Sequence, residues 1–160
     1  MISEYGDPIL EQVCEPFDIE NPPIDPKKLR REMFDIMKEH KGIGLAANQI
    51  GYTFRAFTMQ NLNTNNLSDQ EMLAINPEVI EESDTPVDMW ESCLSFPGVN
   101  AQITRPHKIK ARWIDHNLKV KEEWLAGYTA RIFLHELDHL NGITMKDHVT
   151  PAKWKEISSA

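Results

Sequence analysis

The first clear pattern along the chain is a run of apolar residues with helical spacing. They lie three or four positions apart, so that they share one face of a helix: Leu29, Met33, Ile36 and Met37. This spacing predicts a helix from Pro26 to about Lys41. Asp25 is placed to cap the first turn, and Pro26 suits the first helical position because an N–H there would have no partner. We expect Gly42 to stop the helix.

A second long helix is predicted late in the chain, from Tyr128 to Asn141. Gly142 follows it directly, at the position where glycine commonly ends a helix. Thr150 before Pro151 predicts the cap of one short terminal helix.

Several shorter segments have the patterns of strands. Residues 108–113 alternate polar with apolar side chains, as a half-buried strand does, residues 115–117 supply turn residues, and residues 118–124 return as the second strand of a hairpin. Residues 54–59 and 73–80 are further predicted strands. Antiparallel strands with helices at separate places in the chain predict the α+β fold class.

Length and composition are those of an ordinary globular domain. With 160 residues, 41% apolar and 26% charged, we expect one domain over residues 1–160, with a buried core and no disorder or coiled coil. No apolar run approaches the ~20 residues that cross a bilayer.

The net charge of −8 predicts average repulsion from phosphate backbones and anionic lipid, so we expect no direct binding of nucleic acid or membrane. Residues 1–10 lack a basic segment followed by an apolar core, which argues against a signal peptide and favours a cytoplasmic protein. Two cysteines do not make a disulfide framework, and Cys14 is interpreted as a small buried hydrophobe.

The predicted second helix contains the candidate chemistry, His135-Glu136-Leu137-Asp138-His139. Residues four apart project from one helical face, so His135 and His139 can bind one metal ion, with Glu136 beside them as the general base. The alternative is a pair of surface or helix-capping histidines. Asp138 either accepts a proton from a ligand imidazole or is a solvated charge.

A catalytic metal site needs a third protein ligand and an open position for water. Met145 occupies the position at which a metzincin-type protease has its third histidine, and Glu156 is poorly placed for a thermolysin-like site. We expect His148 to be solvated. Cys93 is the best remaining candidate, because its thiolate binds zinc or iron strongly.

Three segments together resemble the signatures of the peptide deformylase family. Gly42–Gln49 resembles GxGLAAxQ, Glu91–Ser95 resembles EGCLS, and His135–His139 is similar to the HExxH motif in its deformylase form. The resemblance spans about residues 5–147. It implies an α+β fold in which antiparallel sheets pack around the central HExxH helix, with an N-terminal helix.

The resemblance also implies roles for individual residues. The implied metal ligands are Cys93, His135 and His139. Glu136 would activate the metal-bound water and later return its proton, while the Gln49 side chain and the Leu94 N–H would form an oxyanion hole. The family uses one divalent ion per chain, natively Fe²⁺, and tolerates Zn²⁺, Ni²⁺ or Co²⁺.

The implied reaction is removal of the N-formyl group from the N-terminal formyl-methionine of newly synthesised polypeptides. We expect the protein to be a monomer. The backbone of Ile43 and Gly44 would pair with the substrate like an added strand. Family positions suggest these walls for the methionine pocket: Ile43, Met89, Tyr128, Ile132 and the ring of His135. Some family members contact the ribosome through a C-terminal helix, but the tail here is short and weakly basic.

Ser92 replaces the glycine that usually precedes the ligand cysteine. It would be strained if the position requires a positive φ, and otherwise it adds a hydroxyl to the substrate-binding site. Arg105 is expected to pair with Glu91 and brace the Cys93 loop. The rival interpretations are another amidase or protease, a thiol enzyme with Cys93 activated by His135, and an inactive binding module.

Overall fold

The computed structural model describes residues 1–159, with Ser68 described by its backbone alone. Its four α-helices are α1 (Pro26–Glu39), α2 (Leu67–Gln70), α3 (Gly127–Leu140) and α4 (Pro151–Ser158). Its strands are β1 (Gly44–Ala46), β2 (Ala56–Gln60), β3 (Glu71–Glu82), β4 (Pro86–Cys93), β5 (Phe96–Pro106), β6 (Lys108–Ile114) and β7 (Val120–Ala126). Short 3₁₀ turns lie at Pro8–Glu11, Ala47–Ile50 and Met145–His148.

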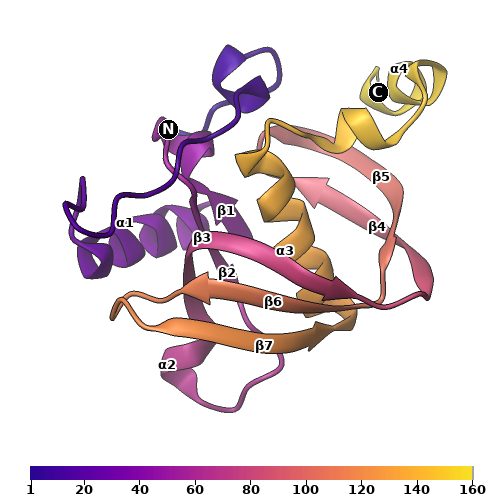
Figure 1. Ribbon diagram of the computed structural model, residues 1–160. Coiled ribbons are helices and arrows are strands. Elements are labelled where there is room, and N and C mark those ends of the chain that lie inside the picture. Colours follow the sequence, from indigo (N-terminus) through magenta and orange to yellow (C-terminus); the bar gives the residue numbers. More distant parts are fainter. Residues whose placement is uncertain (160) are drawn as a thin grey trace.

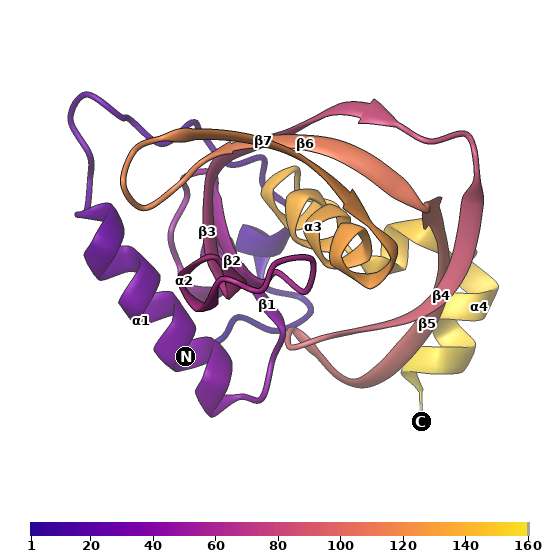
Figure 2. The same cartoon turned by 90° about the horizontal axis from the view of Figure 1, so that it is seen from below.

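The strands form two antiparallel sheets around α3. Five strands pair in the order β1-β2-β3-β6-β7, and β4 pairs only with β5. Figure 1 shows α3 crossing behind the larger sheet, and Figure 2 shows it almost end-on, with β4 and β5 on its far side from β1 and β2. The α+β class and the sheets around a central helix are therefore confirmed.

The N-terminal helix begins where its sequence predicts and ends slightly earlier. The Asp25 carboxylate accepts a hydrogen bond from the Lys27 N–H, and Pro26 occupies the first turn. The left-handed residue after the helix is Lys41, with φ of 57°, so the predicted stop at Gly42 is wrong by one position. A Cβ at Gly42 would lie 2.7 Å from Cδ1 of Leu94, so a larger residue there would require the Leu94 side chain to move.

The other predicted elements are present, with shifted ends. The predicted strands 54–59, 73–80, 108–113 and 118–124 correspond to β2, β3, β6 and β7, and the predicted helix 128–141 corresponds to α3. Gly142 follows α3 with a φ of 72°, and Thr150 caps α4 by accepting from the Lys153 N–H. The sequence did not predict the β4–β5 hairpin, because β4 alternates exposed with half-buried residues and offers no apolar stripe.

The core supports both faces of the larger sheet. One buried cluster packs β2, β3, β6 and β7 against α3, and a second packs α1 against β1, β2 and β3. Cys14 is buried in the first cluster, as predicted for a small hydrophobe. None of the helices in the described part of the chain combines the length and the apolar character that crossing a membrane requires.

Candidate metal centre and active site

Three side chains from distant parts of the sequence meet beside α3. His135 and His139 lie one turn apart on this helix, with ring centroids 5.1 Å apart. Cys93 ends β4, and its Sγ lies 3.2 Å from Nε2 of His139. One ligand atom from each residue lies within 4.8 Å of the other two. The structure therefore brings together the three ligands that the sequence analysis expected.

The β4–β5 hairpin carries Cys93 to this position. Its regular register ends with Ser92 opposite Asn100, after which Cys93 pairs with Phe96. The extra residues on β5 form a bulge, which bends a strand and turns its end. This bend lies at the end of β4, where Cys93 meets α3.

Glu91 links the hairpin to the first imidazole. A carboxylate only accepts, so the Nδ1–H of His135 donates to Oε1 of Glu91 at 2.8 Å, and Nε2 of His135 stays available for another contact. Arg105 donates two hydrogen bonds to the same carboxylate, from Nε to Oε2 at 2.6 Å and from Nη2 to Oε1 at 2.9 Å. The predicted ion pair between Arg105 and Glu91 is confirmed. Burial alone would raise the pKa of Glu91, but Arg105 and His135 hold that pKa well below its ordinary value.

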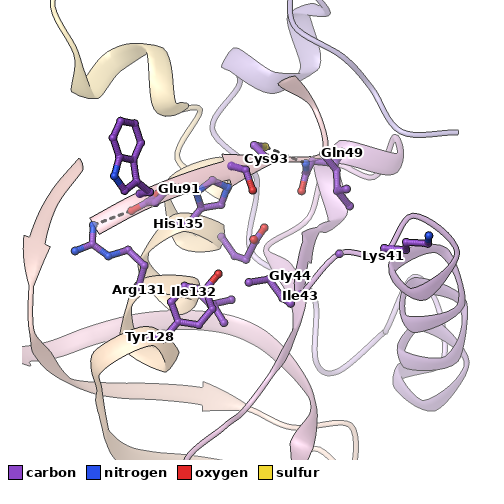
Figure 3. Close-up of a pocket in the computed structure, with 15 residues that line it drawn as sticks. Lys41, Ile43, Gly44, Gln49, Glu91, Cys93, Tyr128, Arg131, Ile132 and His135 are labelled. Carbon is purple, nitrogen blue, oxygen red and sulfur yellow. Dashed lines mark hydrogen bonds and ion pairs between the residues drawn. The ribbon is translucent and has the colours of Figure 1, made fainter. Parts of the chain in front are cut away.

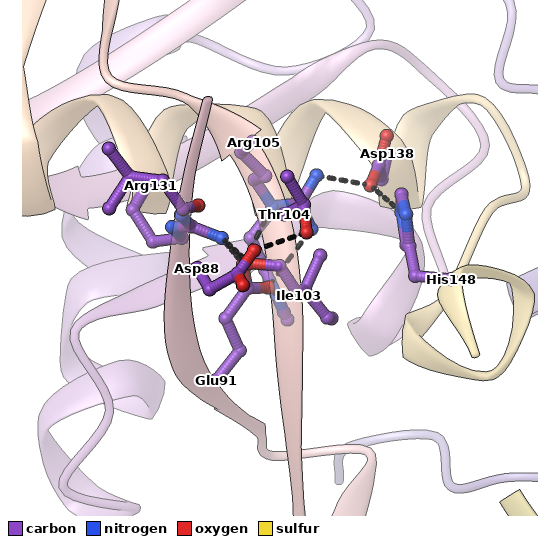
Figure 4. A network of polar contacts seen from close by, with 10 residues as sticks. Asp88, Glu91, Ile103, Thr104, Arg105, Arg131, Asp138 and His148 are labelled. Atoms are coloured by element: carbon purple, nitrogen blue, oxygen red, sulfur yellow. Dashed lines mark hydrogen bonds and ion pairs between the residues drawn. The ribbon is translucent and has the colours of Figure 1, made fainter. Parts of the chain in front are cut away.

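Arg131 is a further partner of Glu91 that the sequence analysis missed. Its Nη1 donates to Oε2 of Glu91 at 2.8 Å and to the Ile103 carbonyl at 2.6 Å, and its Nη2 donates to the Val87 carbonyl at 2.6 Å. The side chain is buried, with the residue only 3% exposed (Figure 4). The sequence did contain a signal for this contact. Arg131 lies among apolar residues at 130–133 of a predicted helix, and a charged side chain in such a position indicates a buried ion pair.

Asp138 and His148 differ from their sequence-based interpretations. Asp138 does not bond to a ligand imidazole; its Oδ2 accepts from Nη1 of Arg105 at 2.8 Å and from Nε2 of His148 at 2.7 Å. His148 is therefore not simply solvated. The reason is position on the helix, because a residue next to His139 faces about 100° away from it. Figure 4 shows the resulting chain of contacts from His148 through Asp138 and Arg105 to Glu91.

Glu136 presents a buried carboxylate beside the three ligands. Burial raises its pKa to about 7, and no hydrogen-bond partner of its Oε1 is found within residues 1–159. A Cβ on Gly44 would lie 2.5 Å from Oε2 of Glu136, so only glycine allows β1 to pass this close. A carboxyl group with such a pKa exchanges protons readily near neutral pH.

The backbone of β1 leaves one edge open to the cavity. The Gln60 N–H donates to the Ile43 carbonyl at 3.0 Å, so the Ile43 carbonyl faces β2. Polar groups alternate in direction along a strand, and those of Gly44 therefore face away from β2. Because β1 is the edge strand of its sheet, an extended peptide can pair at this position.

Gln49 and Leu94 line the same cavity from opposite segments. Oε1 of Gln49 accepts from the Ala46 N–H at 2.8 Å, which fixes the orientation of the amide. Its NH₂ group therefore points towards the ligands, and it lies 2.9 Å from Oγ of Ser95 and 3.6 Å from Sγ of Cys93. Leu94 follows Cys93 in the turn of the hairpin.

The cavity has a volume of about 300 Å³ and opens beside these groups (Figure 3). Its lining includes most of the residues expected to contact substrate: Ile43, Gly44, Ser92, Tyr128, Ile132 and His135. Met89 is not among the lining residues and lies further along β4 from the Cys93 end, so its expected contact with substrate stays a prediction. Trp90, 63% exposed, lines the cavity instead. Ser92 has no positive φ and hence no left-handed strain, so its hydroxyl is an addition to the lining.

The donor set fits a single transition-metal ion. One sulfur and two imidazole nitrogens are a combination that suits zinc or iron, and three protein ligands leave a position for water. Burial opposes ionisation of the Cys93 thiol, yet His139 and His135 lower its pKa well below the ordinary value, so the sulfur can be a thiolate ligand. The Glu91 contact orients His135 as metal-binding histidines are commonly oriented.

Comparison with known proteins agrees with this geometry. A family model described as polypeptide deformylase matches residues 1–155. The chain is 36% identical over 157 residues to a peptide deformylase of Cytophaga hutchinsonii, covering 95% of this chain and 83% of that protein. A peptide deformylase structure from Plasmodium falciparum superposes with a TM-score of 0.84 at 36% identity, covering 98% of this chain and 90% of that one. A probable peptide deformylase from Synechococcus phage S-SSM7 superposes with a TM-score of 0.82 at 32% identity, covering 93% of this chain and 99% of that one.

Replacing Arg131 tests the importance of its contacts with the hairpin. In Arg131→Met, the buried Glu91 carboxylate loses one hydrogen-bond donor, and the carbonyls of Ile103 and Val87 lose the donor that Arg131 supplies. We therefore expect the free energy of unfolding to fall by about 3–5 kcal/mol. Urea unfolding of the metal-free protein measures this change. Arg112→Met is the matched control, because Arg112 is an exposed arginine with two surface ion pairs, and its removal should change stability little. Equal losses in the two variants would contradict the role assigned to Arg131.

Proposed function

The chain belongs to the polypeptide deformylase family, and we propose that it hydrolyses the N-formyl group of N-terminal formyl-methionine on newly synthesised polypeptides through the site beside α3. The observation that carries this proposal is the convergence of Cys93, His135 and His139 next to the buried carboxylate of Glu136. We propose that residues 1–160 act as one catalytic domain, as a monomer, in the cytoplasm where new chains are made.

We propose that Cys93, His135 and His139 hold one divalent metal ion. Such an ion, when bound, acts as a Lewis acid that lowers the pKa of water and polarises a carbonyl group. By resemblance to the family, Fe²⁺ is the proposed native ion, and Zn²⁺, Ni²⁺ or Co²⁺ are proposed substitutes. The thiolate and the two imidazoles are compatible with each of them.

Glu136 is proposed to move the proton. Its carboxylate accepts a proton from the attacking water and then donates it to the amine that leaves, so the product is formate and a free N-terminus. The pKa near 7 and the partnerless Oε1 support this role, because the group can be either charged or neutral at working pH.

Gln49 and Leu94 are proposed to stabilise the developing oxyanion. The NH₂ group of Gln49 is already aimed towards the ligands by its bond to Ala46, so it requires little reorganisation during the reaction. The Leu94 N–H would supply a second donor from the hairpin turn. A mutation that removes one such donor typically lowers the rate about 10²–10³-fold.

The open edge of β1 supports the proposed mode of substrate binding. An extended peptide would pair with the polar groups of Gly44 and place its methionine side chain against Ile132 and Tyr128. Ser92 would face the same peptide from β4. The formyl carbon carries only hydrogen, so a cavity narrowed by Gly44 and Glu136 can reject larger acyl groups.

The contact between Cys93 and His139 also favours a second candidate, a thiol hydrolase. A thiolate 3.2 Å from an imidazole is an arrangement used for nucleophilic catalysis. Such an enzyme would use the sulfur as its nucleophile and would need no metal ion. Metal removal separates this candidate from the deformylase.

The proposed function makes one prediction about substrate and metal together. Protein prepared without oxygen should hydrolyse formyl-methionyl peptide, while the acetylated peptide and the internal bonds of an unblocked peptide should react far more slowly. Removing the metal with a chelator should abolish deformylation, and adding Fe²⁺ or Co²⁺ should restore it. Formate release and metal content are measured in parallel. Activity that survives complete metal removal would support the thiol hydrolase instead.

The second prediction concerns Glu136. Glu136→Gln removes the proton acceptor while keeping the shape of the side chain, so kcat should fall by about 10²–10⁴-fold with one metal ion per chain retained. Glu123→Gln, an exposed change on β7, is the control and should leave kcat unchanged. A Glu136→Gln enzyme with normal kcat would remove Glu136 from the mechanism.

A further inference from the structure

A second concave surface is lined by residues of α1 together with Glu71 and His116. Figure 2 shows α1 beside the turn that joins β6 to β7, in which His116 lies. This surface has a volume of about 330 Å³ and shares no lining residue with the cavity at the metal centre. Cationic side chains of α1 form one wall: Lys27, Arg30, Arg31 and Lys38. We call this surface the α1 groove.

The charge of the α1 groove is opposite to that of the whole chain. Its lining residues include four cationic side chains and two carboxylates, those of Asp35 and Glu71, in a chain with a net charge of −8. The carboxylates of Asp69 and Asp115 lie near the His116 wall. A net negative protein repels polyanions on average, but a local concave patch of the other sign attracts them. The expectation from net charge, that nucleic acid does not bind, therefore does not describe this surface.

Two of the four cationic side chains form no ion pair within residues 1–159. Lys38 pairs with Glu71 at 3.3 Å, and Arg30 donates from Nε to the Glu71 carbonyl at 2.9 Å. Lys27 and Arg31, both exposed, have no ion-pair partner within 4.0 Å among residues 1–159. They lie four positions apart and thus on the same face of α1, roughly 6 Å apart along its axis. Their charges are available to a ligand.

His116 forms part of the opposite wall, in the β6–β7 turn, and responds to these charges. Its pKa is lowered by burial and then by the positive charges of Arg30 and Lys27, against the opposing effect of Asp115 and Asp69. The cations of α1 therefore lie close enough to act on His116, whose imidazole can form hydrogen bonds.

The shape of the groove favours a chain of phosphates over a membrane. From Lys27 to Lys38 the helix rises roughly 16 Å, so the cations are spread along a line rather than gathered at a point. A flat lipid surface cannot follow a concave wall, and α1 exposes no large hydrophobic residue that would anchor in lipid. A flexible single strand can lie in the groove and contact several cations in turn.

We propose that the α1 groove binds the phosphate backbone of RNA and so docks the enzyme beside the chains it processes. The choice of RNA among polyanions rests on the proposed function, because newly made chains emerge next to ribosomal RNA. The C-terminal end of α1 leads directly to Lys41 and Gly42, which line the active-site cavity. An RNA strand in the groove would therefore hold that cavity close to the RNA surface.

Binding of a labelled single-stranded RNA, followed by fluorescence anisotropy over 25–200 mM salt, tests this proposal. The metal-loaded wild-type protein should bind, and the slope of log affinity against log salt should lie between about −1.4 and −2.8, as expected for two to four phosphate contacts. The double variant Lys27→Ala with Arg31→Ala should bind about tenfold more weakly at low salt and show a shallower slope. Its thermal unfolding should match that of the wild type, because both side chains are exposed.

The matched control removes two lysines from α4, Lys153→Ala with Lys155→Ala, and therefore changes the net charge equally. It should retain wild-type RNA affinity. The proposal would be overturned if the α4 control lost RNA binding while the α1 variant kept it. It would also be overturned if the wild-type protein did not bind RNA at low salt. Pyrophosphate or a polyglutamate peptide that competes as well as unlabelled RNA would also overturn it, in favour of a small anion or an acidic polypeptide.

Deformylation of a short formyl-methionyl peptide is measured in all three proteins. Neither variant touches the active-site cavity, so kcat and KM should be unchanged. RNA binding that fails while deformylation persists overturns only the α1 groove proposal. Deformylation that fails in every protein, with RNA binding intact, overturns the proposed function and the docking role that rests on it, but not the binding of RNA by the α1 groove.

Discussion

The buried carboxylate of Glu91 is the interaction on which the candidate site depends. It accepts hydrogen bonds from Arg105, Arg131 and His135, which come from β5 and α3. These bonds join the hairpin that carries Cys93 to the helix that carries both histidines. A buried charge is costly unless it is paired and fully hydrogen-bonded, and here both oxygens have partners. The same contacts that satisfy the charge also fix the position of His135, a candidate metal ligand.

The site uses glycine and buried polar groups to bring its parts close together. Gly44 lets an edge strand pass against Glu136, and the bond from Ala46 aims the Gln49 amide at the ligands. Each of these groups sits on an element that packs against α3 or the larger sheet. The groups proposed to be catalytic are therefore held before substrate arrives, which is the condition for electrostatic stabilisation of a transition state.

Local patterns predicted α1, α3, α4, four strands and the HExxH geometry, because helical and strand periodicity are properties of neighbouring residues. They did not predict the four-residue helix α2. Cys93 was a candidate ligand both by elimination and by the family resemblance, and the ion pair of Arg105 with Glu91 was also predicted; the structure places both as expected. The contacts of Arg131, and those of Asp138 with His148, depend on how the hairpin and the tail pack, which no local pattern contains. The α1 groove likewise depends on the β6–β7 turn folding beside α1. The net charge of the whole chain gives no indication of this local cationic surface.

The central claim is that one sulfur and two imidazole nitrogens from this chain share a single ion. X-ray absorption at the metal edge of the zinc-loaded protein tests it most directly. The account predicts one sulfur at about 2.3 Å and two nitrogens at about 2.0–2.1 Å, with a further light atom completing the shell. Loss of the sulfur contribution in Cys93→Ser, but not in Cys14→Ala, would identify the donor. A shell without sulfur, or one filled by four protein side chains, would contradict the account.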